Sequence, residues 1–214
     1  MKSEPTVFVI DADGHTRDAV RSLVYMMNLR CETYASGQDF LDGFSPSQPG
    51  CAVLEVRIPD INGLDIQSRL VARGAMMPLV FLASPSTVSI AVRAMRAGAL
   101  HFLEKPFREH ELWDAIQEAI ALDRKRRAEQ YHRQRLDGRL ERLTAKERQI
   151  LEMIALGKPK KLMAAELGVC VRTIELRRND IMRKLDVSTA TDLVRFAVLA
   201  CEPWTVGLSD MQYA

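Results

Sequence analysis

The chain has 214 residues and a formal net charge of +2, a length that suffices for two small domains with buried cores. The charge is unevenly distributed: residues 1–107 contain 10 Lys and Arg against 11 Asp and Glu, whereas residues 158–184 contain 8 against 3. A local basic excess is typical of a nucleic-acid-binding element and argues against a generally cationic surface.

Cysteine spacing and hydropathy exclude several classes of protein. The four cysteines form no CxxC pair and no Cys/His ligand spacing, so we expect neither a zinc site nor a disulfide framework. The longest apolar stretch, residues 75–83, is about half of a membrane span and contains Pro78. We therefore predict a cytoplasmic protein without a membrane partner.

Short apolar or β-branched runs alternate with helical-period segments through the first half of the chain. Such alternation predicts a parallel sheet with helices on both faces. Ser36, followed by Asp39, predicts the N-cap and first turn of one of these helices. The expected strands are residues 6–10, 32–35, 52–56, 79–83 and 100–103.

A long helical pattern begins at Glu109 and runs into a charged segment. We interpret residues 1–122 as the first domain and residues 123–142 as a helical linker. Two interpretations of the linker remain open: a solvated charged helix without a further role, or a helix that pairs with its copy in a dimer.

Thr144 and Glu147 have the spacing of a capping box, in which each residue satisfies a backbone donor of the other at a helix start. We therefore place a second, helical domain at residues 143–201. Residues 202–214 show no clear period, and we expect a poorly ordered tail there. The expected helices are residues 145–156, 160–167, 171–185 and 189–201.

The stretch Cys51-Ala-Val-Leu-Glu55-Val-Arg-Ile-Pro59-Asp-Ile-Asn-Gly63-Leu resembles the third strand and following loop of a bacterial response-regulator receiver domain. The resemblance implies a five-stranded, doubly wound α/β domain with strand order 2-1-3-4-5. In that family, two acids on the first strand hold Mg²⁺ and an Asp on the third accepts a phosphoryl group. A Thr or Ser on the fourth strand and a Lys on the fifth contact that group.

Several of these positions carry a different side chain here. Ala12 cannot supply an oxygen ligand to Mg²⁺, Glu55 replaces the acceptor Asp, and Ala83 lacks the hydroxyl that would couple to the aromatic switch position, Phe102. We expect no phosphorylation and no bound metal or other cofactor. The residues that match this pocket are Asp11, Ala12, Glu55, Ala83, Phe102 and Lys105.

Our hypothesis for this pocket is that Glu55 reaches Lys105 and forms an ion pair that partly replaces phosphoaspartate. The imitation is incomplete, because a Glu brings one negative charge against about 1.5 to 2 for a phosphate. Two alternatives remain: the pocket has decayed and the domain is a dimerisation scaffold, or another carboxylate, such as Asp60 or Asp13, accepts phosphate.

The run from Leu143 to Leu185 is similar to the LuxR-type four-helix DNA-binding domain, with Gly157, Gly168 and the Thr173-Ile-Glu175 core in register. Together with the receiver half, it places the chain in the FixJ/NarL class of response regulators. The small-residue helix and tight turn before residue 171 allow a second helix to enter a major groove.

Residues 171–185 are the expected recognition helix, with Ile174, Ile181, Met182 and Leu185 facing inward. By the family's pattern, Glu175, Leu176 and Asn179 face bases; these types match cytosine N4, a thymine methyl and adenine. Two departures are Cys170 in place of a common Ser N-cap and Arg177 in place of a frequent His. Arg172 lies on the polar face, and the candidates for phosphate contacts are Lys161, Thr173, Arg177, Arg178 and Arg183.

We expect a dimeric, sequence-specific transcription regulator that works without phosphorylation and is not an enzyme. Its predicted partners are double-stranded promoter DNA with two half-sites, a second copy of the chain, and RNA polymerase or another regulator. The alternative from a different class is an interaction module that sequesters a partner regulator without reading DNA.

Overall fold

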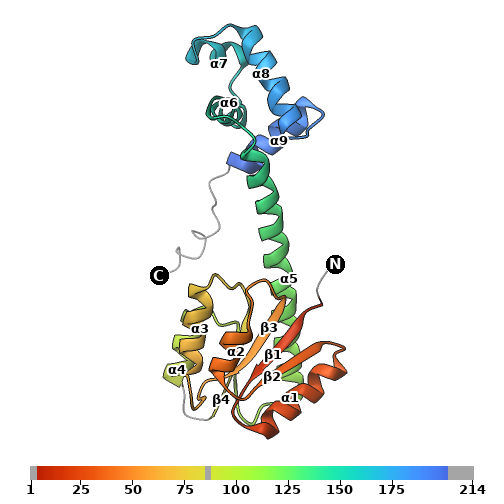
Figure 1. The fold of residues 1–214 in the computed structure, drawn as a ribbon, viewed down its shortest axis with the longest axis vertical. Helices are drawn as coiled ribbons and strands as arrows, with labels where there is room; N and C mark the ends of the chain where they lie inside the picture. Colours follow the sequence, from red (N-terminus) through yellow and green to blue (C-terminus); the bar gives the residue numbers. More distant parts are fainter. Residues whose placement is uncertain (1–3, 85–87, 202–214) are drawn as a thin grey trace. The chain divides into compact units, whose positions relative to one another are not determined.

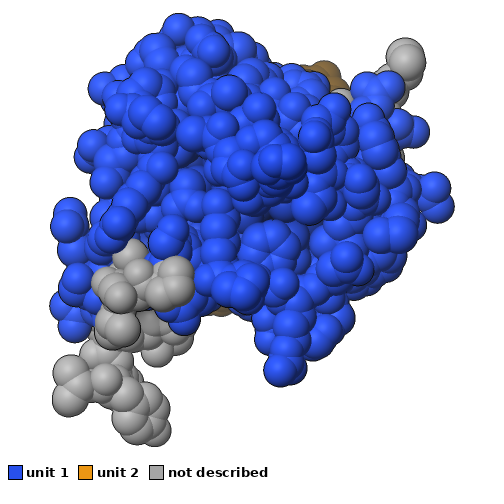
Figure 2. Space-filling view, turned by 90° about the horizontal axis from the view of Figure 1, so that it is seen from below, with its two compact units in different colours: residues 1–129 blue, residues 130–214 orange. Residues whose placement is uncertain are grey.

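A computed structural model describes residues 4–84 and 88–201 of this chain (Figure 1). The chain forms two compact units, residues 1–129 and 130–214, and Figure 2 shows one face of the first unit in blue. The division falls within the predicted linker, whereas the predicted tail lies outside the described residues. Within those residues, no helix is long and apolar enough to cross a membrane.

The first unit contains a five-stranded parallel sheet in the predicted order, β2-β1-β3-β4-β5. Every residue of β1, β3 and β4 is buried, as expected for strands covered on both faces. The strands are β1 (Thr6–Ile10), β2 (Arg30–Tyr34), β3 (Gly50–Glu55), β4 (Leu79–Ala83) and β5 (His101–Glu104).

The predicted ends of three strands were wrong by one or two residues. The strand predicted at 32–35 begins at Arg30, because Arg30 and Cys31 pair with Thr6 and Val7 although they lie on an exposed edge. The strand predicted at 52–56 begins at Gly50, which pairs with Thr6. The strand predicted at 100–103 is shifted by one residue, to 101–104, by its register on β4.

Helices cover both faces of this sheet (Figure 1). One buried cluster joins the sheet to α2, α3 and α4, with Phe40, Ile66 and Ala94 as contributors. The other joins the sheet to α1 and α5, through Val24 and Ile116 among others. The helices are α1 (Gly14–Met26), α2 (Gly37–Gly43), α3 (Gly63–Ala72), α4 (Val88–Arg96) and α5 (Glu109–Leu140), and Ser36 caps α2 as predicted.

The start of the predicted linker packs into the first unit. Asp123 on α5 is fully buried and accepts hydrogen bonds from Gly50 N (3.0 Å) and Arg127 Nε (2.8 Å). Arg127 also donates to the carbonyl oxygens of Pro46 and Ser47, at 3.4 and 3.0 Å. This part of the charged run is therefore not a fully solvated face, because Asp123 is buried against Gly50 and Arg127 binds the backbone of the segment before β3.

The second unit is helical, and its helices agree with the predicted ones within one residue at each end. The capping box is confirmed: Thr144 N donates to Glu147 Oε2 (2.8 Å) and Glu147 N to Thr144 Oγ1 (3.3 Å). Lys184 Nζ lies 2.7 Å from Glu147 Oε2, which ties the end of α8 to the start of α6. These helices are α6 (Ala145–Ala155), α7 (Lys160–Glu166), α8 (Val171–Lys184) and α9 (Ala190–Cys201).

Candidate switch pocket and nucleic-acid interface

Three charged side chains meet at the carboxyl edge of the sheet, where parallel strands bring distant residues together. Lys105 Nζ lies 2.5 Å from Glu55 Oε2 and 2.6 Å from Asp11 Oδ2. The pair between Glu55 and Lys105 was predicted, whereas the second acceptor, Asp11, was not paired with Lys105 from the sequence. Burial lowers the pKa of Lys105, but hydrogen bonds from its ammonium to Asp11 and Glu55 outweigh this and raise it overall.

Both carboxylates of this cluster are fully engaged. Asp11 and Glu55 are 2% and 5% exposed. The second oxygen of Asp11 accepts a hydrogen bond from Asp13 N (2.9 Å), and the second oxygen of Glu55 accepts one from Arg57 N (3.1 Å). Each of the four carboxylate oxygens therefore has a partner: Lys105 contacts one oxygen of each carboxylate, and a backbone N–H contacts the other.

The other predicted pocket residues contribute no polar side-chain atom. Ala12 is exposed beside Asp11, and Ala83 is fully buried at the end of β4. Phe102 on β5 is half-buried, with its ring centroid 6.3 Å from that of Phe81. Sequence reasoning missed Arg17, whose Nη1 donates to the carbonyl oxygens of Asp11 (2.6 Å) and Ala12 (2.9 Å).

The residues of this pocket do not fit the Mg²⁺ ion that the receiver resemblance implies. Mg²⁺ requires near-octahedral oxygen coordination, but the two carboxylates are bound to Lys105 and Ala12 offers only a methyl group. The Arg17 guanidinium adds a positive charge at the adjacent carbonyls. Across the described part of the chain, no group of three or more His, Cys, Asp or Glu side chains is placed to hold a metal ion.

The two carboxylates considered as alternative phosphate acceptors lie at helix starts: Asp13 is the N-cap of α1, and Asp60 accepts hydrogen bonds at the start of α2. Asp13 caps α1 and accepts from Thr16 Oγ1 (2.7 Å); hydrogen bonds from the Thr16 hydroxyl and backbone lower its pKa. Partial burial raises the pKa of Asp60, but hydrogen bonds from Gln38 N (2.9 Å), the Ser36 hydroxyl (2.8 Å) and Gly37 N lower it to about 2. Both carboxylates therefore have structural partners outside the cluster around Lys105.

Helix α8 presents one apolar and one polar face, as predicted. Ile174, Ile181 and Leu185 are fully buried, and Met182 packs against the same cluster. The turn that leads from α7 to α8 contains Gly168 at φ +64°, a conformation that residues with a Cβ rarely adopt. This turn and apolar face orient the opposite face of α8 outward.

The predicted DNA-contact residues lie on α8, except Lys161, which lies on α7. Glu175 pairs with Lys160 on α7 (2.8 Å), a cation that sequence reasoning missed and whose hydrogen bond lowers the pKa of Glu175. Arg183 pairs with Asp180 (2.9 Å). The exposed members are Lys161, Arg172, Glu175, Leu176, Asn179 and Arg183, and the partly exposed members are Thr173, Arg177 and Arg178.

The start of α8 has the weaker cap that Cys170 predicts. Cys170 is the N-cap residue, and its side chain accepts no capping hydrogen bond from the helix backbone. Its sulfur instead lies 3.1 Å from Thr173 Oγ1. The first turn of α8 therefore lacks the side-chain cap that Ser, Thr, Asp or Asn supplies at most helix starts.

The sheet with its charged edge and the helical unit with its outward α8 correspond to two known families. Residues 7–117 match the response regulator receiver domain, and residues 141–197 match the luxR family of bacterial regulatory proteins. The fold and the site thus define a two-component response regulator with a LuxR-type DNA-binding domain.

More specifically, the chain belongs to the FixJ/TodT-type response regulators, a family of transcriptional regulators. It is 36% identical to the response regulator TodT of Pseudomonas putida over 88% of this chain and 83% of TodT. A structure of the response regulator StyR has a TM-score of 0.81 and 36% identity, with 91% of this chain and 98% of StyR covered. Full-length FixJ from B. japonicum has a TM-score of 0.57 and 32% identity, with 93% and 98% covered.

Proposed function

We propose that this protein is a sequence-specific transcription regulator whose receiver domain works without phosphorylation. The observation that carries the proposal is the ion-pair cluster in which Lys105 lies between Asp11 and Glu55. In the family pattern, this lysine balances the charge of the phosphoryl group. Here two buried carboxylates of the chain itself already pair with it.

The length of the Glu55 side chain supports this interpretation. An ordinary receiver adds a phosphoryl group to an Asp and so extends negative charge toward the lysine. Glu55 is one methylene longer than Asp and reaches Lys105 at 2.5 Å without modification. It brings one negative charge against about 1.5 to 2 for a phosphate, so we expect a fixed conformation that only partly resembles the phosphorylated one.

The residues that would transmit phosphorylation favour a receiver domain with one fixed conformation over one that switches between two. Ala83 has no hydroxyl with which to contact a phosphoryl oxygen. It therefore cannot couple a phosphoryl group to the position of the Phe102 ring, as a Thr or Ser does in the family. The alternative acceptors already have partners, because Asp13 caps α1 and Asp60 accepts hydrogen bonds at the start of α2. We therefore propose that abundance, a ligand or a protein partner controls the activity of this regulator.

DNA recognition is proposed to occur through α8 in the major groove. Its exposed residues Glu175, Leu176 and Asn179 recur at helical spacing, and residues 158–184 carry 8 basic against 3 acidic residues. We propose a dimer that reads two half-sites in successive major grooves. The binding should weaken as salt rises, because phosphate contacts release counterions.

A selection of bound sequences from random duplex DNA tests this function. We expect one enriched motif with two related halves, and the selected duplex then serves as the operator. Glu55→Gln, which removes one charge but leaves the pair between Asp11 and Lys105, should change operator affinity or dimerisation. Lys125→Met, on an exposed face of α5, is the control and should change neither.

Two outcomes would contradict the proposal in different ways. The lack of any enriched motif would reject sequence-specific DNA reading and favour an interaction module. An enriched motif, together with unchanged affinity and dimerisation in Glu55→Gln, would leave DNA reading intact but reject the role of the ion-pair cluster.

A further inference from the structure

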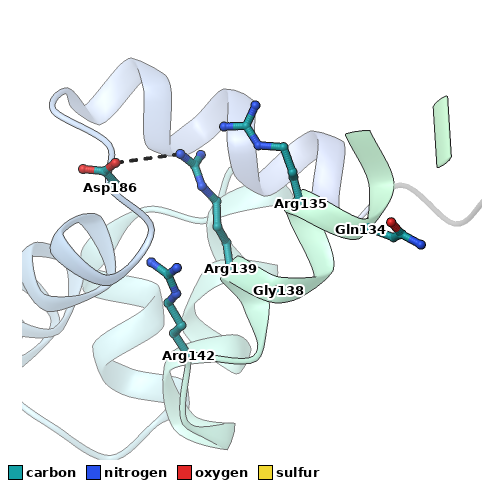
Figure 3. A pocket seen from close by; sticks show the side chains of 6 residues that line it. All are labelled: Gln134, Arg135, Gly138, Arg139, Arg142 and Asp186. Atoms are coloured by element: carbon teal, nitrogen blue, oxygen red, sulfur yellow. Dashed lines mark ion pairs between the residues drawn. The ribbon is translucent and has the colours of Figure 1, made fainter. Parts of the chain in front are cut away.

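The second unit contains a hollow beside the C-terminal end of α5, just before α6 begins (Figure 3). Its volume is about 340 Å³, and its lining comes from the last turns of α5 and from the corner after α8. The lining residues are Gln134, Arg135, Gly138, Arg139, Arg142 and Asp186. None of them belongs to the predicted DNA-contact set.

The charges around the hollow are unbalanced. Three guanidinium groups face a single carboxylate, Asp186, which is 4.0 Å from Arg139 and has an 87% exposed side chain. In the part of the chain that the structure describes, neither Arg135 nor Arg142 forms an ion pair with a carboxylate. Arg135, Arg139 and Arg142 are four and three residues apart, so they share one face of α5.

Two of these arginines lie near aromatic rings. The Arg135 guanidinium lies 5.9 Å from the centre of the Tyr131 ring, and that of Arg139 lies 6.0 Å from the centre of the Phe196 ring. Both distances are at the outer limit of about 6 Å for a cation–π contact. The aromatic rings therefore form part of the surroundings of two of the three cations.

Gly138 keeps the middle of the hollow open. It lies within α5, and a Cβ built at this position would meet no atom within 4 Å. A glycine inside a helix is unfavourable by roughly 1 kcal/mol relative to alanine, and no positive φ or close backbone contact requires one here. Gly138 therefore leaves open space in the lining of the hollow beside the three arginines.

We propose that this hollow binds a small phosphate-bearing anion of the nucleotide class. Guanidinium groups match phosphate oxygens through paired hydrogen bonds, and the exposed Asp186 carboxylate can accept a hydrogen bond from a ligand hydroxyl. The volume is within the range of small-molecule sites, about 300 to 1,000 Å³. A bound anion would link the last turns of α5 to the corner after α8 within this unit.

The position of the hollow separates it from the base-reading residues. Asp186 follows the C-terminus of α8, whereas Glu175, Leu176 and Asn179 lie in the first nine residues of that helix. At a rise of about 1.5 Å per residue, the end of α8 at Lys184 is roughly 8 Å farther along the helix axis than Asn179. The site can therefore take a ligand without occupying the outward face of α8.

Isothermal titration of the full-length protein with inorganic pyrophosphate, adenosine diphosphate and adenosine tests this proposal. All titrations are made at one ionic strength. We expect saturable binding of pyrophosphate and of adenosine diphosphate, and no binding of adenosine. Arg142→Gln should weaken pyrophosphate binding by about tenfold or more, because one charge-assisted hydrogen-bonding group is lost.

Two further variants make the result specific to the hollow. Gly138→Leu retains all three arginines but places a side chain in the open space, so it should abolish binding even though the helix remains intact. Arg148→Gln removes an exposed charge on α6 and should bind pyrophosphate like the parent protein. Circular dichroism checks that each variant keeps its helical content.

Three results would overturn the proposal. The first is a lack of saturable binding in the parent protein, and the second is equal weakening in Arg142→Gln and Arg148→Gln. The third is unchanged pyrophosphate binding in Arg142→Gln together with a smaller salt dependence of its binding to duplex DNA. That combination would assign the arginines to the DNA backbone instead of a small anion.

Discussion

Replacing Lys105 with Met removes the cation that two buried carboxylates share, while it keeps an unbranched side chain. Asp11 and Glu55 each place an oxygen within 2.6 Å of Lys105 Nζ. Those two oxygens are therefore at most about 5 Å apart, where two negative charges repel by roughly 3 kcal/mol at an effective dielectric constant of about 20. Loss of one partner from a buried ion pair costs about 3 to 5 kcal/mol. This range and the estimated repulsion agree, so we expect Lys105→Met to lower the free energy of unfolding by about 3 to 5 kcal/mol.

Urea unfolding measures this loss in the first unit. Trp113 on α5 packs against the core of that unit, and a Trp204→Phe background makes it the sole tryptophan reporter. In this background, Lys105→Met should lower the free energy of unfolding by the predicted amount, whereas Lys125→Met should change it little. The additional change Glu55→Gln should recover part of the loss, because only the Asp11 charge then remains unpaired.

Two results would refute this reasoning. If Lys105→Met destabilised the unit no more than Lys125→Met, the ion-pair cluster would contribute little to the folded state. If the double variant were as unstable as Lys105→Met alone, repulsion between Asp11 and Glu55 would not be the cause of the loss.

Three further predictions concern the second unit and DNA. Asn179→Ala should relax discrimination at one base pair by about 1 to 3 kcal/mol, whereas Arg178→Ala should weaken binding to every sequence. Affinities for the operator and for its single-base variants distinguish the two effects. Uniform weakening by Asn179→Ala would reject the base-reading role of Asn179. Gly138→Ala should stabilise α5 by up to about 1 kcal/mol, measured as slower hydrogen exchange of its last turns; unchanged or faster exchange would contradict this. Burial raises the pKa of Glu147, but hydrogen bonds from Lys184 and Thr144 outweigh this and lower it overall. The ionised Glu147 therefore stabilises the second unit, and this contribution should be lost as the pH falls below about 4.3, the ordinary pKa of Glu. The protection factors of the α6 amides against hydrogen exchange should therefore fall less with acid in Glu147→Gln than in the parent. An equal fall in the two proteins would contradict the assignment.

Periodicity and local motifs were sufficient to predict the five strands and the second-unit helices. These signals are local: the run of β1 and the capping box of Thr144 and Glu147 each lie within a few residues. Strand ends were less predictable, because register on a neighbouring strand decides them. Arg30 and Cys31, for example, join β2 only through their pairing with β1.

Long-range polar contacts could not be predicted from spacing. Lys105 and Asp11 are 94 residues apart in sequence, and Gly50 and Asp123 are 73 apart. The receiver resemblance placed Asp11, Glu55 and Lys105 in one pocket, but it did not show that one ammonium contacts both acids. The buried Asp123 was hidden within a charged run whose composition resembles a solvated helix.

Intact mass measurement after treatment with acetyl phosphate and Mg²⁺ tests the central claim most directly. A phosphorylatable receiver protein is treated in parallel as the positive control, and operator affinity is measured on the same samples. Our account predicts that this protein gains no phosphoryl mass and that its operator affinity does not change. A stable phosphoryl adduct on Glu55, Asp13 or Asp60, accompanied by a change in operator affinity, would contradict it.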